Sequence, residues 1–184
     1  KIVNEPTRNR IISEVVLKEY NEGNIPILVI IRVIKHGHIL KDLFIDAGVD
    51  SGDIQYVHGS THPNKRMEVK EDFRDRKIPI VIASSIWVEG IDIPSVSVLV
   101  QADGGGGKKI QEGKGIRSVI QKVGRVIRKP IKEGEIEVNR KKKNFVTVYD
   151  FFDNTHRDLL RHSMNRFKTY SMEEAFVVKE VEYD

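Results

Sequence analysis

Two spacings of hydrophobic residues alternate along the chain. Short apolar runs rich in valine and isoleucine are typical of buried strands, whereas apolar residues three and four positions apart are typical of amphipathic helices. The pattern predicts strands over Pro26–Ile31, Ile54–His58, Ile78–Ser84, Val96–Gln101, Phe145–Asp150 and Ala175–Val181. It predicts helices over Arg8–Glu22, Gly37–Ala47, Pro63–Arg76 and Gly115–Arg128, and a last helix from Asn154 with Leu159, Leu160, Met164 and Phe167 on its inner face.

This alternation of strands and helices predicts an α/β fold in which helices cover both faces of a mostly parallel sheet. Neither an internal repeat nor a long linker interrupts the pattern, so we expect a single domain over residues 1–184. Ligands of such folds gather beyond the carboxyl ends of the strands. The segments that follow the predicted strands are therefore the first places to look for chemistry.

Composition narrows the classes of protein that fit this pattern. The chain has 184 residues, of which 39% are hydrophobic and 32% are charged, and no apolar run approaches the ~20 residues that a membrane span needs. It contains no cysteine, which excludes disulfides and thiolate metal sites and fits a reducing cytoplasm, as in a bacterium or a phage-infected cell. The net charge of +4 permits a polyanionic partner. Basic residues are densest between Lys108 and Lys143.

The helix predicted over Gly115–Arg128 has two contrasting faces. Its apolar face carries Ile116, Val119, Ile120, Val123, Val126 and Ile127, and the roughly opposite face carries Gln121, Gly124, Arg125 and Arg128. Two guanidinium groups on one polar face suit planar capture of phosphate. The plainer interpretation is an amphipathic surface helix with solvated arginines. Gly124 favours the first interpretation, because glycine inside a helix indicates close approach by a ligand or another backbone.

A second candidate segment, Ala83–Ser95, leaves the third predicted strand at its carboxyl end. It contains a pair of hydroxyls, Ser84 and Ser85, and then a turn in which Gly90 precedes Asp92. The Asp92 carboxylate is suited to accept hydrogen bonds from ribose hydroxyls, and the Ser84 hydroxyl is suited to donate to a phosphate. Taken alone, this turn favours a purely structural role.

The two segments together resemble motifs V and VI of superfamily 2 helicases: Gly90-Ile-Asp-Ile-Pro94 comes first, and Gln121-x-x-Gly-Arg-x-x-Arg128 follows about thirty residues later. Ile31–His38 resembles the motif IV region, and Tyr56–Gly59 resembles the strand and turn after it. Most of the chain is similar to the second, C-terminal RecA-like domain of these helicases, and most similar to phage UvsW-type branch-migration helicases.

The resemblance implies a role for each matching residue. Arg128 would be an arginine finger and Arg125 a second catalytic phosphate contact, while Gly90, Asp92 and Gln121 would lie near ATP. Contacts with the nucleic acid, expected to be DNA, would come from Ser84, Ser85, His58 and Gly59. Ser84 stands where many members have threonine.

The sequence also lacks half of an ATP site. It contains neither the phosphate loop Gly-x-x-x-x-Gly-Lys-Ser/Thr nor an Asp-Glu-x-His or Asp-Glu-Ala-Asp string. The resemblance implies that an N-terminal RecA-like domain supplies these groups and the Mg²⁺ ligands, and that this chain alone does not hydrolyse ATP. We predict no metal site, because His58 and His62 have no nearby partners. The alternatives are a nucleic-acid binding module without ATPase activity and a small-molecule enzyme on the same fold.

Overall fold

The computed structural model describes residues 2–84, 96–104, 146–174 and 176–183 of the chain. The helix predicted over Gly115–Arg128 and most of the segment Ala83–Ser95 lie outside these residues. So do six candidate site residues, which are Ser85, Gly90, Asp92, Gln121, Arg125 and Arg128.

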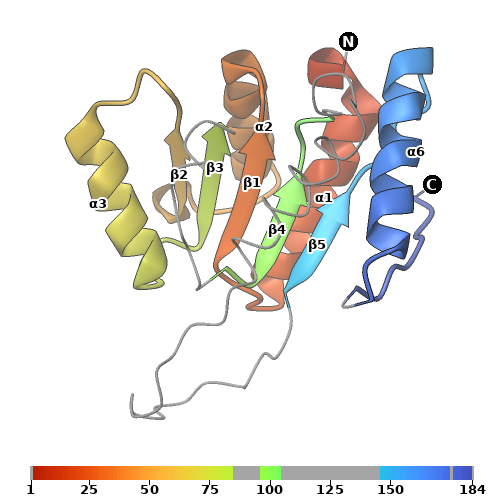
Figure 1. Ribbon diagram of the computed structural model, residues 1–184. Coiled ribbons are helices and arrows are strands. Elements are labelled where there is room, and N and C mark those ends of the chain that lie inside the picture. The colour runs from red at the N-terminus through yellow and green to blue at the C-terminus, as the bar shows by residue number, and fades with distance from the viewer. Residues whose placement is uncertain (1, 85–95, 105–145, 175, 184) are drawn as a thin grey trace.

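The described residues form a five-stranded sheet with helices on both faces (Figure 1). The strands are β1 (Ile27–Ile31), β2 (Ile54–Val57), β3 (Ile80–Ser84), β4 (Val98–Gln101) and β5 (Thr147–Asp150). Every pairing is parallel, in the spatial order β2-β3-β1-β4-β5. The helices are α1 (Pro6–Asn21), α2 (Ile34–Asp46), α3 (Pro63–Arg74) and α6 (Arg157–Ser171), with short 3₁₀ helices at Ile2–Asn4 and Ser51–Asp53. The predicted α/β class is confirmed.

Each face of the sheet has its own hydrophobic core. In the central strand β1, all five side chains are fully buried, as expected for a parallel strand covered on both sides. Ile27, Val29 and Ile31 pack with α1 and α2, whereas Leu28 and Ile30 pack on the opposite face with Val69 and Phe73 of α3. The same alternation in β3 directs Ile80, Ile82 and then Ser84 toward the α1 and α2 side.

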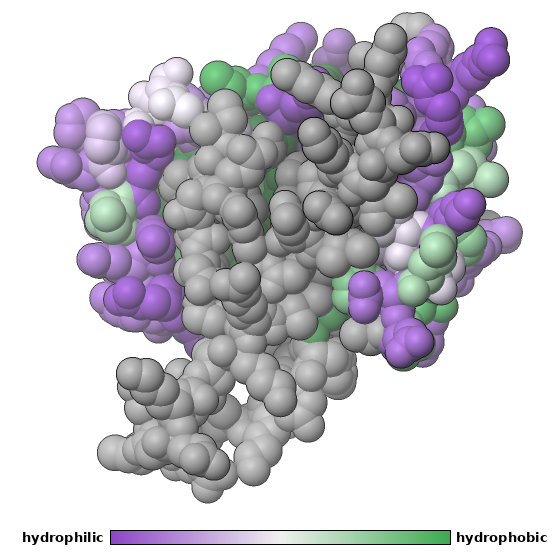
Figure 2. Space-filling view, viewed as in Figure 1, coloured by the Kyte–Doolittle hydropathy of each residue, from purple (hydrophilic) through white to green (hydrophobic). Residues whose placement is uncertain are grey.

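Helix α6 contradicts the predicted inner face. Leu160, Met164 and Phe167 are 38%, 54% and 36% exposed, while the buried residues of this helix are Ser163, Arg166 and Thr169. The physical reason is a polar network: Arg166 donates to Asp150 Oδ2 at 2.7 Å and to the Phe151 carbonyl oxygen at 3.0 Å. In Figure 2, pale and green residues accordingly lie among the purple ones over α6.

Other differences from the predicted elements are smaller. Residues 176–183 contain no strand, so the strand predicted over Ala175–Val181 is wrong for the part that the structure describes. Helix α2 begins one turn earlier than predicted, at Ile34, and α6 begins at Arg157 rather than Asn154. In α3, Val69 and Phe73 are buried, whereas Met67 is 56% exposed.

Candidate nucleic-acid interface

The carboxyl ends of β2 and β3 bring described candidate residues together. Val57 of β2 pairs with Ala83 of β3, so His58 and Ser84 directly follow paired residues on neighbouring strands. Ser84 is 7% exposed, and its Oγ atom is buried and has no hydrogen-bond partner among the described residues. Leaving a buried hydroxyl unpaired costs about 1–3 kcal/mol, so this group gains free energy from a ligand oxygen placed within its reach.

His58 and Gly59 lie in the tight turn that follows β2. The Ser60 amide donates to His58 Nδ1 at 3.3 Å, and the Thr61 amide donates to the His58 carbonyl oxygen at 3.0 Å. Because Nδ1 accepts a hydrogen bond, the proton of a neutral His58 ring is on Nε2, which makes Nε2 a donor. A Cβ atom on Gly59 would meet nothing within 4 Å, so its backbone is open to solvent.

Helix α2 begins at the same edge, immediately after β1. Its N-cap residue, Val33, makes no side-chain capping bond. The His36 amide donates to the Val33 carbonyl oxygen at 2.9 Å, which leaves the amides of Ile34 and Lys35 for solvent or a ligand. Arg32 and Lys35 flank this start, and both are exposed without an ion pair among the described residues. The free amides, the helix dipole and the two cations all favour an anion here.

The ring of Tyr56 fills the space between β2 and the first turns of α2. Its hydroxyl donates to the Ile34 carbonyl oxygen at 2.9 Å. The ring centroid lies 5.0 Å from those of both His38 and His58. Gly37 lies beneath the ring, and a Cβ atom there would come within 2.6 Å of Tyr56 Cε2. Glycine at this helical position is therefore explained by the close approach of Tyr56.

The sequence prediction singled out Ser84, His58 and Gly59 but assigned no role to Arg32, Lys35, His38 or Tyr56. The signal for Tyr56 was its position two residues before His58, because alternate residues of a strand face the same side of a sheet. The two cations and His38 could not be recognised in the same way. Their position beside β2 and β3 depends on the order of the strands in the sheet, which places the end of β1 and the start of α2 there.

A buried ionic network lies at the carboxyl ends of β4 and β5. Arg8 of α1 donates to Asp153 at 2.6 Å and to the Ala102 carbonyl oxygen at 3.1 Å. Tyr170 donates to Asp150 Oδ2 at 2.9 Å, and burial, followed by the negative charge of Asp150, raises the pKa of Tyr170. These groups satisfy one another, which indicates a structural role.

The buried side chain of His36 links α2 to α1 near the carboxyl ends of the strands, through a contact with Asn9. Its Nε2 lies 2.9 Å from Asn9 Oδ1, and Asn9 Nδ2 donates to the Val3 carbonyl oxygen. The amide of Asn9 is thereby oriented so that Oδ1 accepts the proton of His36 Nε2. Burial, followed by the charge of Arg8, lowers the pKa of His36 to about 4, so this ring is neutral at physiological pH.

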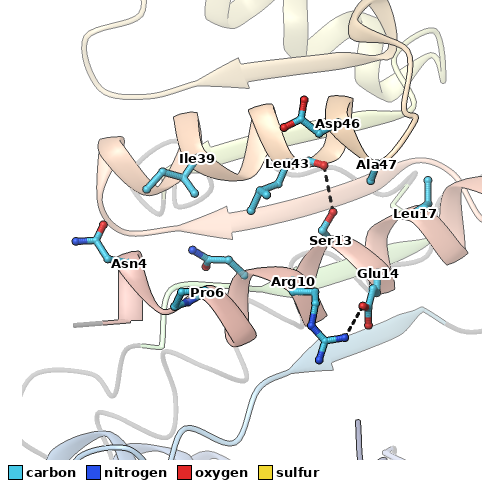
Figure 3. Close-up of a pocket in the computed structure, with 11 residues that line it drawn as sticks. Asn4, Pro6, Arg10, Ser13, Glu14, Leu17, Ile39, Leu43, Asp46 and Ala47 are labelled. Atoms are coloured by element: carbon cyan, nitrogen blue, oxygen red, sulfur yellow. Dashed lines mark hydrogen bonds and ion pairs between the residues drawn. The ribbon is translucent and has the colours of Figure 1, made fainter. Parts of the chain in front are cut away.

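A groove between the outer sides of α1 and α2 is a weaker candidate (Figure 3). Its apolar lining includes Leu17, Ile39 and Leu43. Several of its polar groups are already engaged: Arg10 pairs with Glu14 at 2.8 Å, and Ser13 Oγ donates to the Leu43 carbonyl oxygen at 3.4 Å. None of the candidate residues that the structure describes lines this groove.

Metal-binding clusters and membrane-spanning helices are both absent from the part of the chain that the structure describes. Within it, no three His, Asp or Glu side chains are grouped so that they could hold a metal ion. No helix in these ranges combines the length and the apolar composition needed to cross a membrane.

Comparison with known proteins identifies the family. A family model described as the helicase conserved C-terminal domain matches residues 38–130. The chain belongs to this family. The match begins within α2, and it contains the turn at His58, the end of β3 and the segments that resemble motifs V and VI.

Individual relatives are consistent with this helicase domain. The chain is 30% identical over 122 residues to putative helicase 22 of a Sulfolobus islandicus filamentous virus, covering 66% of the chain and 19% of the relative. It is 28% identical over 118 residues to the DNA 3'-5' translocase XPB2 of Sulfurisphaera tokodaii, covering 64% of the chain and 23% of the relative. The chain thus spans about a fifth of the length of these relatives.

The match to a relative named as an RNA helicase is shorter. Pre-mRNA-splicing ATP-dependent RNA helicase PRP28 of Lodderomyces elongisporus is 41% identical over 44 residues, which cover 24% of the chain and 7% of the relative.

Among solved structures, T4 UvsW superposes with a TM-score of 0.63 over 92% of the chain and 33% of that structure, at 24% identity. The predicted RecA-like fold, and the resemblance to the C-terminal domain of superfamily 2 helicases and to UvsW, are confirmed.

Proposed function

We propose that this chain is the C-terminal half of an ATP-dependent superfamily 2 helicase or translocase that acts on DNA. The observation that carries the proposal is the surface where the uncapped start of α2, flanked by Arg32 and Lys35, adjoins the buried hydroxyl of Ser84. Membership of the helicase C-terminal family gives this surface a natural ligand, the phosphate backbone of a nucleic acid. The longer match to a relative named as a DNA translocase, compared with the match to an RNA helicase, supports DNA.

At this surface, the protein binds the backbone of a strand. Phosphate oxygens accept hydrogen bonds from the first two amides of α2, from the Ser84 hydroxyl and from Nε2 of His58. Arg32 and Lys35 neutralise charge. Backbone contacts of this kind position a strand without reading its sequence. Weak, sequence-independent binding with a strong salt dependence follows from this chemistry.

The ATP-dependent part of the proposal rests on the residues that resemble motifs V and VI. Gly90, Asp92 and Gln121 would adjoin ATP, Arg125 would hold its phosphates, and Arg128 would neutralise charge as the γ-phosphoryl group departs. An N-terminal RecA-like domain would complete the site with the phosphate loop and the Mg²⁺ ligands. Closure of the two domains on ATP, and reopening after hydrolysis, would then move the protein along the strand.

The salt dependence of DNA binding tests the proposed backbone contacts. Fluorescence anisotropy of a labelled mixed-sequence oligonucleotide gives the dissociation constant at several salt concentrations. Lys35→Gln should weaken binding and make the log–log salt slope shallower by about 0.7, the value expected for one phosphate contact on a single strand. The matched control is Lys18→Gln, because Lys18 is an exposed lysine in the last turn of α1.

Equal effects of Lys35→Gln and Lys18→Gln would mean that attraction to DNA depends on net charge alone. That result, or the absence of salt-sensitive binding by the unmodified chain, would contradict the proposed interface.

A further inference from the structure

An apolar and aromatic surface adjoins the phosphate-binding groups. It consists of Val33, Ile34, His38, Tyr56 and His58, and we refer to it as the aromatic patch. Val33 and Ile34 are 46% and 43% exposed, although both are large hydrophobic residues. His38 is also exposed, and the rings of Tyr56 and His58 are partly exposed. Exposed apolar side chains that gather at one place on a protein indicate a surface used for binding.

The rings of this patch are held in fixed positions. Tyr56 is anchored by its bond to the Ile34 carbonyl oxygen and by contact with Gly37. His38 meets Tyr56 at an interplanar angle of 88°, and His58, fixed through its Nδ1 atom, meets Tyr56 at 51°. A surface whose rings are ordered before binding loses little conformational entropy when a planar ligand packs on it.

Charge beside the patch indicates the kind of ligand. Arg32 precedes Val33 and Lys35 follows Ile34, and neither cation has an ion pair among the described residues. A ligand that fits therefore has planar apolar groups joined to negative charges at short intervals. A single strand of nucleic acid has this chemistry, because its bases are available to stack on aromatic rings while its phosphates contact cations. In a duplex, the faces of the bases are stacked on one another.

We infer that the aromatic patch binds unpaired bases, so that this domain contacts the bases as well as the backbone of a single strand and prefers it to a duplex. This inference rests on the proposed function, which requires only backbone contacts. His38 is the most informative residue of the patch, because its ring is exposed and its removal leaves Gly37, Tyr56 and the core in place.

The test measures binding and base stacking together on the 184-residue chain. The probes are a single-stranded oligonucleotide containing 2-aminopurine, whose fluorescence responds to stacking, and a blunt duplex of the same sequence. His38→Ala should weaken single-strand binding about five- to tenfold, the lower part of the range for loss of one stacked base, and reduce the fluorescence change. Duplex binding should change less than twofold. His38→Phe should restore both single-strand signals, whereas His38→Leu should not.

A matched control is His156→Asn, which removes a partly exposed histidine at the start of α6 while keeping a residue type that can cap the helix. It should leave single-strand binding unchanged. Equal losses on single strand and duplex in His38→Ala, or no loss on either, would overturn the inference while leaving backbone binding intact. Failure of the unmodified chain to bind any DNA would instead overturn the proposed function.

Discussion

The contact between Gly37 and Tyr56 leads to a prediction in which one substitution changes stability in opposite directions in two backgrounds. Replacing glycine by alanine inside a helix ordinarily stabilises a protein by about 0.5–1 kcal/mol. At Gly37, however, the new methyl group would come within 2.6 Å of Tyr56 Cε2, so the ring would have to move. Moving it sacrifices the hydrogen bond to Ile34, worth about 1 kcal/mol, and crowding typically costs a further 1–3 kcal/mol.

We therefore expect Gly37→Ala to lower the free energy of unfolding by about 1–3 kcal/mol, the helix gain being subtracted from these costs. In a Tyr56→Ala background the obstacle is gone, and the same substitution should raise the free energy of unfolding by about 0.5–1 kcal/mol. Urea denaturation of the four chains, followed by circular dichroism, measures both changes and the coupling between them. Additive effects, or stabilisation by Gly37→Ala in the unmodified chain, would refute the reasoning.

Two further predictions concern the buried polar groups. Arg8→Ala should lower the free energy of unfolding by about 3–5 kcal/mol, because it leaves the buried Asp153 carboxylate without its partner. Arg10→Ala should lower it by at most about 0.5 kcal/mol, because the pair of Arg10 with Glu14 is exposed. Similar urea midpoints for the two variants would contradict this difference. Folding lowers the pKa of His36 from 6.5 to about 4, so the unfolded chain binds this proton more readily than the folded chain. Above pH 6.5, His36 should therefore have no effect on the pH dependence of stability. As the pH falls from 6.5 to 4, it should lower the free energy of unfolding by up to about 3 kcal/mol. His36→Gln should flatten that part of the curve of unfolding free energy against pH, and an unchanged curve would show that other groups cause the loss.

Much of the fold was predictable because its strands are buried on both faces. The runs Ile27–Ile31 and Ile80–Ser84 are apolar at almost every position, and the structure pairs them in parallel at the centre of the sheet. Ser84 stood out as a candidate site residue because it is a hydroxyl at the carboxyl end of such a strand. These inferences needed only local sequence and the general behaviour of parallel sheets.

Helix α6 shows what local sequence does not contain. Its apolar spacing indicated that Leu160, Met164 and Phe167 face inward, yet the buried side of the helix carries Ser163 and Arg166. Burying arginine is tolerable when partners offset its charge and accept from its donors. Asp150 and the Phe151 carbonyl oxygen, at the end of β5, do so for Nε and Nη2, while the buried Nη1 has no partner among the described residues. The packing of Tyr56 on Gly37 is likewise a contact between separate elements. Periodicity along one segment contains no information about such partners.

The proposal that this chain completes an ATP site is tested most directly by Arg128→Ala in a protein that joins the chain to its N-terminal RecA-like domain. Steady-state ATP hydrolysis is measured together with equilibrium binding of a nucleotide analogue and of DNA. An arginine that acts mainly as the phosphoryl group departs should, when removed, lower kcat by at least about a hundredfold, or roughly 2.7 kcal/mol, while both affinities change far less. Arg128→Lys should restore little, because an ammonium group does not reproduce the planar fork of arginine. Turnover close to that of the unmodified protein in Arg128→Ala would contradict the proposal.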